Sequence, residues 1–147
     1  MKSYATKSLA IIAIVAFVMF IAYSSSTISN YSHNHPILTK VRENFAKINP
    51  DYSKIPLREG DSAFTENKEV ITLCLKDPDT GKYYDMNTIM YVALHELAHV
   101  LCETQGHGDE FKKKFSKVLR YAAKLKIYDP RQQMSSTYCG LNQGESS

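Results

Sequence analysis

One segment, residues 89–102, is apolar around nearly its whole circumference when drawn as a helix, yet ionisable side chains stand at its centre. A helix that is apolar on every face is normally buried. The middle of this one holds His95, Glu96 and His99. Because a buried carboxylate without a partner is strongly unfavourable, the segment needs a compensating positive charge. We therefore predict a buried helix built around a charged site.

The spacing of these three residues indicates that the charge is a metal ion. His95 and His99 are four residues apart, so they lie on one helical face about a turn apart. Two imidazoles placed so can both reach one ion at about 2.0–2.1 Å. Glu96 is rotated by about 100° from His95, beside the ion, where it can take a proton from metal-bound water. This is the HExxH pattern of zinc peptidases, and it makes Glu96 the predicted catalytic base.

A third ligand is predicted just beyond this helix. His107 stands between Gly106 and Gly108, and glycines there let the chain turn back towards the metal. The remaining histidines, His33 and His35, belong to a polar linker. A catalytic zinc site takes three protein ligands and leaves a fourth position for water. The predicted Zn²⁺ ligands are His95, His99 and His107. The alternative third ligands are Glu103, which would be on the same helix as His99, and Glu110.

The pattern around this segment predicts an α+β fold. Apolar residues at helical spacing alternate with a β-branched run and with turns rich in Pro, Gly and Asp. Such an order places helices on one face of a small sheet. The expected elements are an N-terminal helix over 37–48, a strand over 69–75, the active-site helix over 88–104 capped by Asp85 or Asn87, and a C-terminal helix over 109–127.

Residues 9–23 form an uninterrupted apolar run preceded by Lys2 and Lys7. The run approaches the length of a transmembrane helix, and the lysines place the N-terminus in the cytosol. We therefore expect a single-pass membrane protein, with residues 1–30 as anchor and linker start and residues 31–147 as the catalytic domain. The alternative is a signal peptide cleaved after Ser24, which would make the domain secreted or lumenal. A buried core helix is disfavoured, because the remaining chain could hardly surround it.

The charge distribution argues against a globally basic nucleic-acid binder. The formal net charge is +3, and removing the two N-terminal lysines leaves roughly +1 on the rest. Basic residues nevertheless concentrate in the helix over 112–126. Two interpretations are open for it, the solvated face of an amphipathic helix or contact with nucleic acid or anionic lipid.

The three cysteines offer no zinc or redox motif, because none is spaced as CxxC. Their odd number means that any disulfide leaves one thiol free. The simplest interpretation is that Cys74 and Cys102, at least, are small buried apolar residues. The pairing state of Cys139 stays open.

The stretch LHELAHVLCETQGHGDEF resembles the SprT-like and WLM zinc metallopeptidases. These are small zincins with HExxH and a downstream His near an acidic-aromatic pair. The resemblance extends in particular to short WLM-like proteins of large DNA viruses, in which HELAH, GHxxEF and a terminal YCG recur. It covers about Val70 to Gly140. A metzincin is excluded, because Cys102 stands where that motif needs glycine. The resemblance implies a zincin-like domain that hydrolyses proteins or peptides.

Three functions remain in competition on the sequence. The first is a membrane-anchored zinc peptidase, the second a SprT/WLM-type protease acting on DNA-bound proteins, and the third a non-catalytic, zinc-stabilised binding module. Glu96 argues against the third, because zinc binding alone does not need it. Tyr128 and Tyr138 are candidate oxyanion stabilisers, with packing as the alternative. In zincins a strand placed like residues 70–75 pairs with extended substrate. The alternative is a core strand.

Overall fold

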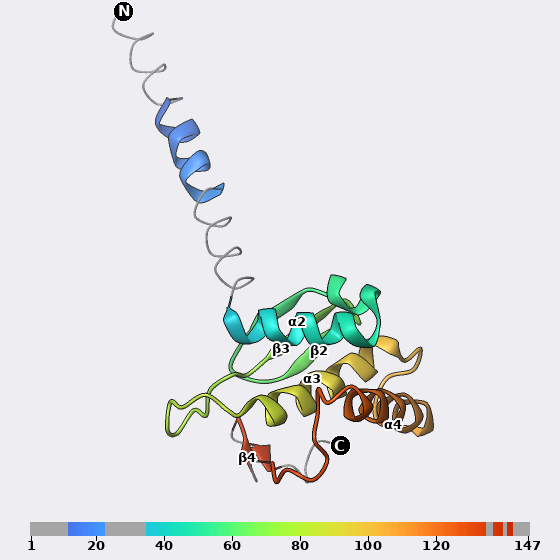
Figure 1. Ribbon diagram of the computed structural model, residues 1–147. Coiled ribbons are helices and arrows are strands. Elements are labelled where there is room, and N and C mark those ends of the chain that lie inside the picture. Colours follow the sequence, from blue (N-terminus) through green and yellow to red (C-terminus); the bar gives the residue numbers. More distant parts are fainter. Residues whose placement is uncertain (1–11, 23–34, 135–136, 140, 143–147) are drawn as a thin grey trace, which may run out of the picture. The chain divides into compact units, whose positions relative to one another are not determined.

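The computed structural model of the protein describes residues 12–22, 35–134, 137–139 and 141–142 (Figure 1). The chain divides into two compact units, residues 1–34 and 35–147, each considered by itself. In the first unit the described residues form one helix over 12–22. The second unit holds the remaining helices and strands.

The predicted membrane anchor is wrong for the described part of the chain. Among the described residues, no helix is both long and apolar enough to cross a membrane. The single-pass localisation with a cytosolic N-terminus, predicted from residues 9–23, is therefore contradicted. The cleavage site of the alternative, at Ser24, lies outside the described residues.

The second unit is α+β, as predicted, with helices packed on a small sheet (Figure 1). Helix α3 packs against β2 and β3, and helix α2 packs against β1. The elements are α2 (Pro36–Ile48), the 3-10 helix η1 (Pro50–Lys54), β1 (Leu57–Glu59), β2 (Phe64–Glu66), β3 (Val70–Leu73), α3 (Met86–Leu101), α4 (Asp109–Lys124), β4 (Thr137–Tyr138) and β5 (Leu141–Asn142).

Strand β3 is the central strand of the three-stranded sheet, whose order is β1-β3-β2. β1 runs parallel to β3, and β2 runs antiparallel to it with Thr65 opposite Ile71. Asn67 and Lys68, both at positive φ, make the turn between β2 and β3. Because both edges of β3 are paired, the core-strand interpretation of residues 70–75 is correct. The edge strands β1 and β2 each have one side unpaired within this sheet, and β2 is the one that lines the cleft described below.

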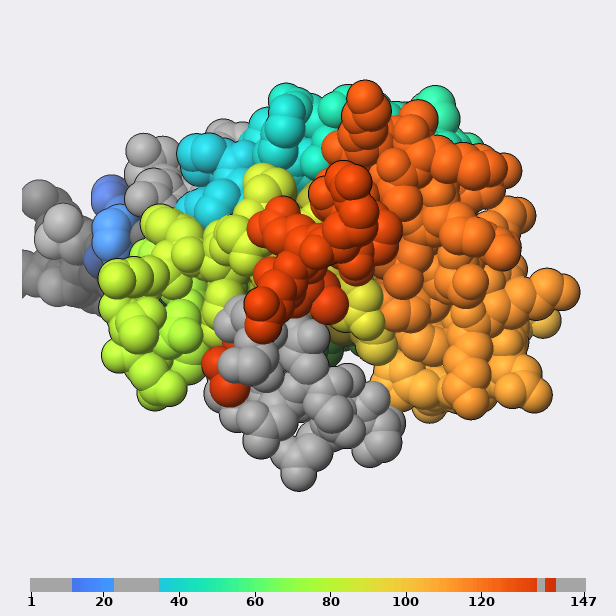
Figure 2. Space-filling model, turned by 60° about the horizontal axis from the view of Figure 1, so that its bottom comes forward, coloured from blue at the N-terminus to red at the C-terminus, as the bar shows by residue number. Residues whose placement is uncertain are grey.

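Helix α3 starts and ends at defined residues. The Asp85 carboxylate accepts hydrogen bonds from the backbone N–H and the hydroxyl of Thr88, at 3.0 and 2.7 Å, so Asp85 is the cap. The other candidate, Asn87, instead exchanges two hydrogen bonds with the backbone of Asp129. These bonds hold the segment after α4 against α3, over which it runs in Figure 2. The helix ends at Leu101, earlier than predicted, because the backbone at Cys102 is extended.

The core lies between the sheet, α2 and α3, and α4 covers one side of this unit (Figure 2). Helix α4 buries one face, and most of its basic side chains are exposed on the other. The largest fully buried apolar residues include Phe45, Leu57, Ile71, Leu73, Leu94 and Leu97.

A disulfide between Cys74 and Cys139 joins the end of β3 to the C-terminal segment. It corrects the interpretation of Cys74 as an unpaired apolar residue, whereas Cys102 is buried and free as expected. Hydrogen bonds flank the disulfide: the Tyr138 hydroxyl donates to the Cys74 carbonyl, and the Cys139 N–H donates to the Tyr84 hydroxyl. The pairing could not be foreseen, because the two cysteines are 65 residues apart.

Candidate metal centre

The structure brings the three histidines of the predicted site together. His95 and His99 come from α3, and His107 from the loop that follows it. Their Nε2 atoms form a triangle, with 3.3 Å between His95 and His99, 3.1 Å between His99 and His107, and 3.0 Å between His107 and His95. Tetrahedral coordination at about 2.0–2.1 Å separates ligand nitrogens by roughly 3.3 Å. The donor set therefore fits a zinc-sized ion with one coordination position left over.

Burial and the neighbouring histidines favour the uncharged form of His95 and His99. Burial, followed by the neighbouring His99 and His107, lowers the pKa of His95 to about 4. Burial and His107 also lower the pKa of His99. Near pH 7 these two imidazoles are therefore uncharged, and each offers a nitrogen lone pair. A neutral imidazole is the form that binds metals.

The loop over 102–108 carries His107 back to the helix. Gly106 has φ +82°, a backbone conformation that side chains other than glycine rarely adopt. Gly108, in contrast, is extended at the start of α4 and does not use that freedom. The prediction that glycine allows the return of the chain is thus correct at one of the two positions.

The alternative third ligand Glu110 has another role in this structure. Its carboxylate accepts hydrogen bonds from the backbone N–H groups of Glu103 and Thr104, at 2.9 and 3.0 Å, and from the Thr104 hydroxyl at 2.7 Å. These bonds lower the pKa of Glu110 to about 2. The first turn of α4 therefore holds the loop that carries His107. Glu103 is not on α3, because that helix has already ended.

Phe111 forms an aromatic wall against the triangle. Its ring centroid lies 4.8, 4.4 and 4.6 Å from those of His95, His99 and His107. At the level of sequence, Phe111 is only the aromatic residue of the GHxxEF pattern, with no contact to the metal centre predicted for it. The available signal was its position four residues after His107, in the first turn of α4. Within the described residues, the buried Nδ1 of His107 has no hydrogen-bond partner.

Glu96 stands beside the triangle with its side chain buried, at 6% exposure. Burial raises its pKa, and a hydrogen bond from Thr65 partly opposes that rise. The Thr65 hydroxyl lies 2.8 Å from the carboxylate oxygen Oε2. The sequence pattern missed Thr65, because β2 has only three residues and shows no alternation that would mark a strand.

A cleft of about 460 Å³ exposes this site. All four predicted site residues line it, together with the edge strand β2 and the turn that follows. The candidate oxyanion residues Tyr128 and Tyr138 are not among the described lining residues. Both are buried, and the Tyr138 hydroxyl is bonded to the backbone of Cys74. The packing interpretation therefore holds for both in this structure.

The fold and site define a small α+β protein with three imidazoles arranged to hold a metal ion beside a buried carboxylate. The model of the WLM domain family matches residues 65–146, more than half of the chain. The protein belongs to the WLM domain family.

Similar proteins come from large viruses. The chain is 42% identical over 90 residues to Uncharacterized protein 042R of Invertebrate iridescent virus 3, and 43% identical over 89 residues to Uncharacterized protein 136R of Invertebrate iridescent virus 6. It is 32% identical over 126 residues to Uncharacterized protein R325 of Acanthamoeba polyphaga mimivirus. These matches cover 61%, 59% and 81% of this chain, but 57%, 50% and 61% of the relatives. The chain thus spans less than two thirds of their length. No solved structure matches it.

Proposed function

We propose that this protein is a zinc-dependent metallopeptidase that hydrolyses peptide bonds. The observation that carries the proposal is the convergence of three Nε2 atoms within 3.3 Å of one another, next to the buried carboxylate of Glu96. Membership of the WLM family supports it. His95, His99 and His107 are the proposed zinc ligands.

A zinc ion held there would supply a Lewis acid that activates water and polarises the scissile carbonyl. Glu96 is the proposed general base, which takes the proton from the attacking water and passes it to the leaving amine. Burial of Glu96 raises the proton affinity of its carboxylate, which suits that transfer. The hydrogen bond from Thr65 orients the carboxylate.

Strand β2 is the proposed docking edge for an extended peptide. It lines the cleft through Phe64 and Thr65, and its outer edge is unpaired within the sheet. A peptide added alongside would satisfy the free backbone groups of β2, which is β-augmentation. From the sequence, residues 70–75 are the candidate for this role, but β3 is paired on both sides.

A non-catalytic, zinc-stabilised module accounts less well for the site. Such a module would bury Glu96 at a cost in stability without using it. The alternative of a protease acting on DNA-bound proteins differs only in substrate, and it stays a prediction.

The test is the metal content and peptidase activity of the full chain. We expect one zinc ion per chain and cleavage of an unfolded protein or a quenched peptide library. Removing zinc with a chelator should abolish cleavage, and adding zinc back should restore it. Stoichiometric zinc without cleavage would favour the non-catalytic module. Cleavage that survives complete removal of metal would refute the mechanism.

A further inference from the structure

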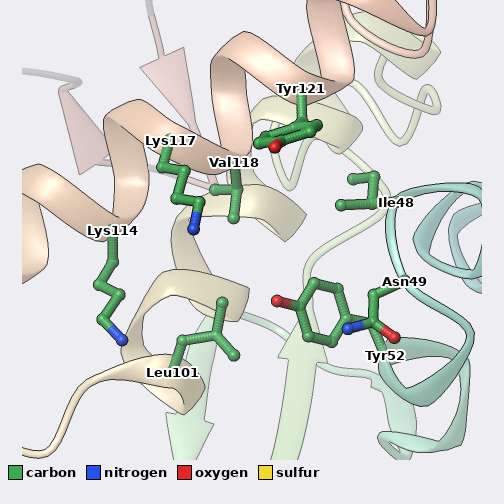
Figure 3. A pocket seen from close by; sticks show the side chains of 8 residues that line it. All are labelled: Ile48, Asn49, Tyr52, Leu101, Lys114, Lys117, Val118 and Tyr121. Atoms are coloured by element: carbon green, nitrogen blue, oxygen red, sulfur yellow. The ribbon is translucent and has the colours of Figure 1, made fainter.

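A second concave surface lies between α4 and the corner formed by α2 and η1, and we name it the α4 groove (Figure 3). Its volume is about 270 Å³. It shares no lining residue with the metal-centre cleft. Its lining residues are Ile48, Asn49, Tyr52, Leu101, Lys114, Lys117, Val118 and Tyr121.

One wall of the α4 groove is cationic. Lys114 and Lys117 are three residues apart on α4, and both ammonium groups point into the groove (Figure 3). None of its described lining residues is acidic. In the described part of the chain, neither lysine belongs to an ion pair. Glu110, one helical turn before Lys114, attracts that lysine electrostatically but does not line the groove. Two neighbouring cations facing one groove still favour binding of an anion, and a phosphate can accept hydrogen bonds from both.

The remaining lining residues of the groove suit a planar ring of an organic ligand. Tyr121 is 51% exposed, so its ring is accessible to a ligand. Tyr52 lies across the groove from it, and its hydroxyl points inwards (Figure 3). The Asn49 side-chain oxygen accepts a hydrogen bond from the N–H of Asp51 at 3.0 Å, so its amide NH₂ remains available as a donor. An inorganic anion could accept a hydrogen bond from this amide, but it would leave the exposed ring of Tyr121 unused.

We propose that the α4 groove binds a nucleoside monophosphate unit. The phosphate lies between Lys114 and Lys117, and the base stacks on the ring of Tyr121. Aromatic stacking combined with basic side chains is the usual means of holding unpaired nucleotides. The small volume of the groove admits a single unit, either a free nucleotide or one nucleotide of a single strand. This inference concerns a separate surface and does not depend on the proposed peptidase activity.

The experiment measures binding to the full chain by titration calorimetry. The probes are thymidine 5′-monophosphate, thymidine, inorganic phosphate and a short single-stranded oligothymidylate. We expect the monophosphate to bind more tightly than thymidine or phosphate alone. Equal affinity of monophosphate and oligonucleotide would identify a free nucleotide as the ligand, and much tighter binding of the oligonucleotide would identify a strand. Both results support the proposal. Absence of binding by both at millimolar concentration overturns it, as does saturable binding of only an acidic peptide.

Matched variants locate the binding site. Replacing both lysines, Lys114→Gln with Lys117→Gln, should weaken monophosphate binding by about tenfold or more, the worth of a charge-assisted hydrogen bond. Lys113→Gln is the control, because Lys113 is exposed on the same helix but does not line the groove. Tyr121→Ser should weaken binding by about fivefold, whereas Tyr121→Phe keeps the ring and the affinity. Equal effects of the lysine pair and the control would overturn the assignment. Circular dichroism verifies that each variant is folded.

Discussion

The hydroxyl of Thr65 lies 2.8 Å from a carboxylate oxygen of Glu96 and so joins the edge strand β2 to helix α3. The same hydroxyl lies 3.0 Å from the backbone carbonyl oxygen of Glu96. The side chain proposed as general base is therefore held by the strand proposed to receive the substrate. If a peptide binds along β2 as proposed, we expect this contact to link the substrate strand to the orientation of Glu96.

Thr65→Val should lower kcat about tenfold, because it removes a hydrogen bond to a charged group without changing the side-chain volume. Zinc content and KM should change little, since Thr65 is not a proposed ligand. Thr65→Ser, which restores the hydroxyl, should recover most of the loss. A loss of zinc in the valine variant would instead assign Thr65 a role in folding of the site.

Glu96→Gln should keep the metal and lower peptidase activity by a factor of about 10² to 10⁴, the usual contribution of a general base. The amide preserves the shape of the side chain but cannot take the proton of water. Metal analysis together with the cleavage rate separates these effects. Glu59→Gln, an exposed acid on β1, is the matched control. Undiminished turnover in the Glu96 variant would refute the mechanism.

His107→Ala should lower zinc affinity sharply while α3 remains folded, because one of three protein ligands is lost. Zinc competition with a chromogenic chelator measures the affinity, and circular dichroism reports the helix. Glu103→Ala and His35→Ala should leave zinc affinity unchanged, since neither side chain approaches the triangle of nitrogens. If His107→Ala binds zinc as the parent does, the third ligand is another residue.

Glu110→Gln should destabilise the metal-free protein at neutral pH. The folded-state pKa of Glu110 is lowered from 4.5 to about 2, so its carboxylate stabilises the fold above about pH 4.5. That contribution is lost as the pH falls towards 2. The stability difference between parent and variant, measured by urea denaturation, should therefore shrink over this interval. Asp109→Asn controls for the helix-dipole effect, because Asp109 is in the same first turn. A difference that stays constant with pH would contradict the loop-holding role.

Replacing Cys74 and Cys139 by Ser should lower the free energy of unfolding by about 4 kcal/mol, the estimate for a loop closed by cysteines 65 residues apart. Denaturant unfolding of parent and variant measures the difference. Reductant should destabilise the parent similarly but leave the double variant unchanged. Cys102→Ser keeps the disulfide and should retain the sensitivity to reductant. A parent protein indifferent to reductant would argue against the disulfide.

Helical spacing accounts for what could be predicted at the site. The placement of His95 and His99 on one face depends on residues four apart, which a helix brings together wherever it lies in the fold. The cap at Asp85 and the turn at Gly106 likewise depend on residues that are close together in the sequence. The membrane prediction is contradicted, because among the described residues no helix is long and apolar enough to cross a bilayer.

The sequence by itself determined the candidate zinc ligands, Glu96 beside them and an α+β fold around them, because these follow from periodicity within short segments. Tertiary structure alone decided that β3 is central and β2 is an edge strand, that Thr65 reaches Glu96, and that Cys74 pairs with Cys139. Each of these relationships joins residues distant along the chain. Their formation depends on how the helices and strands pack together, and no local pattern of residues encodes it.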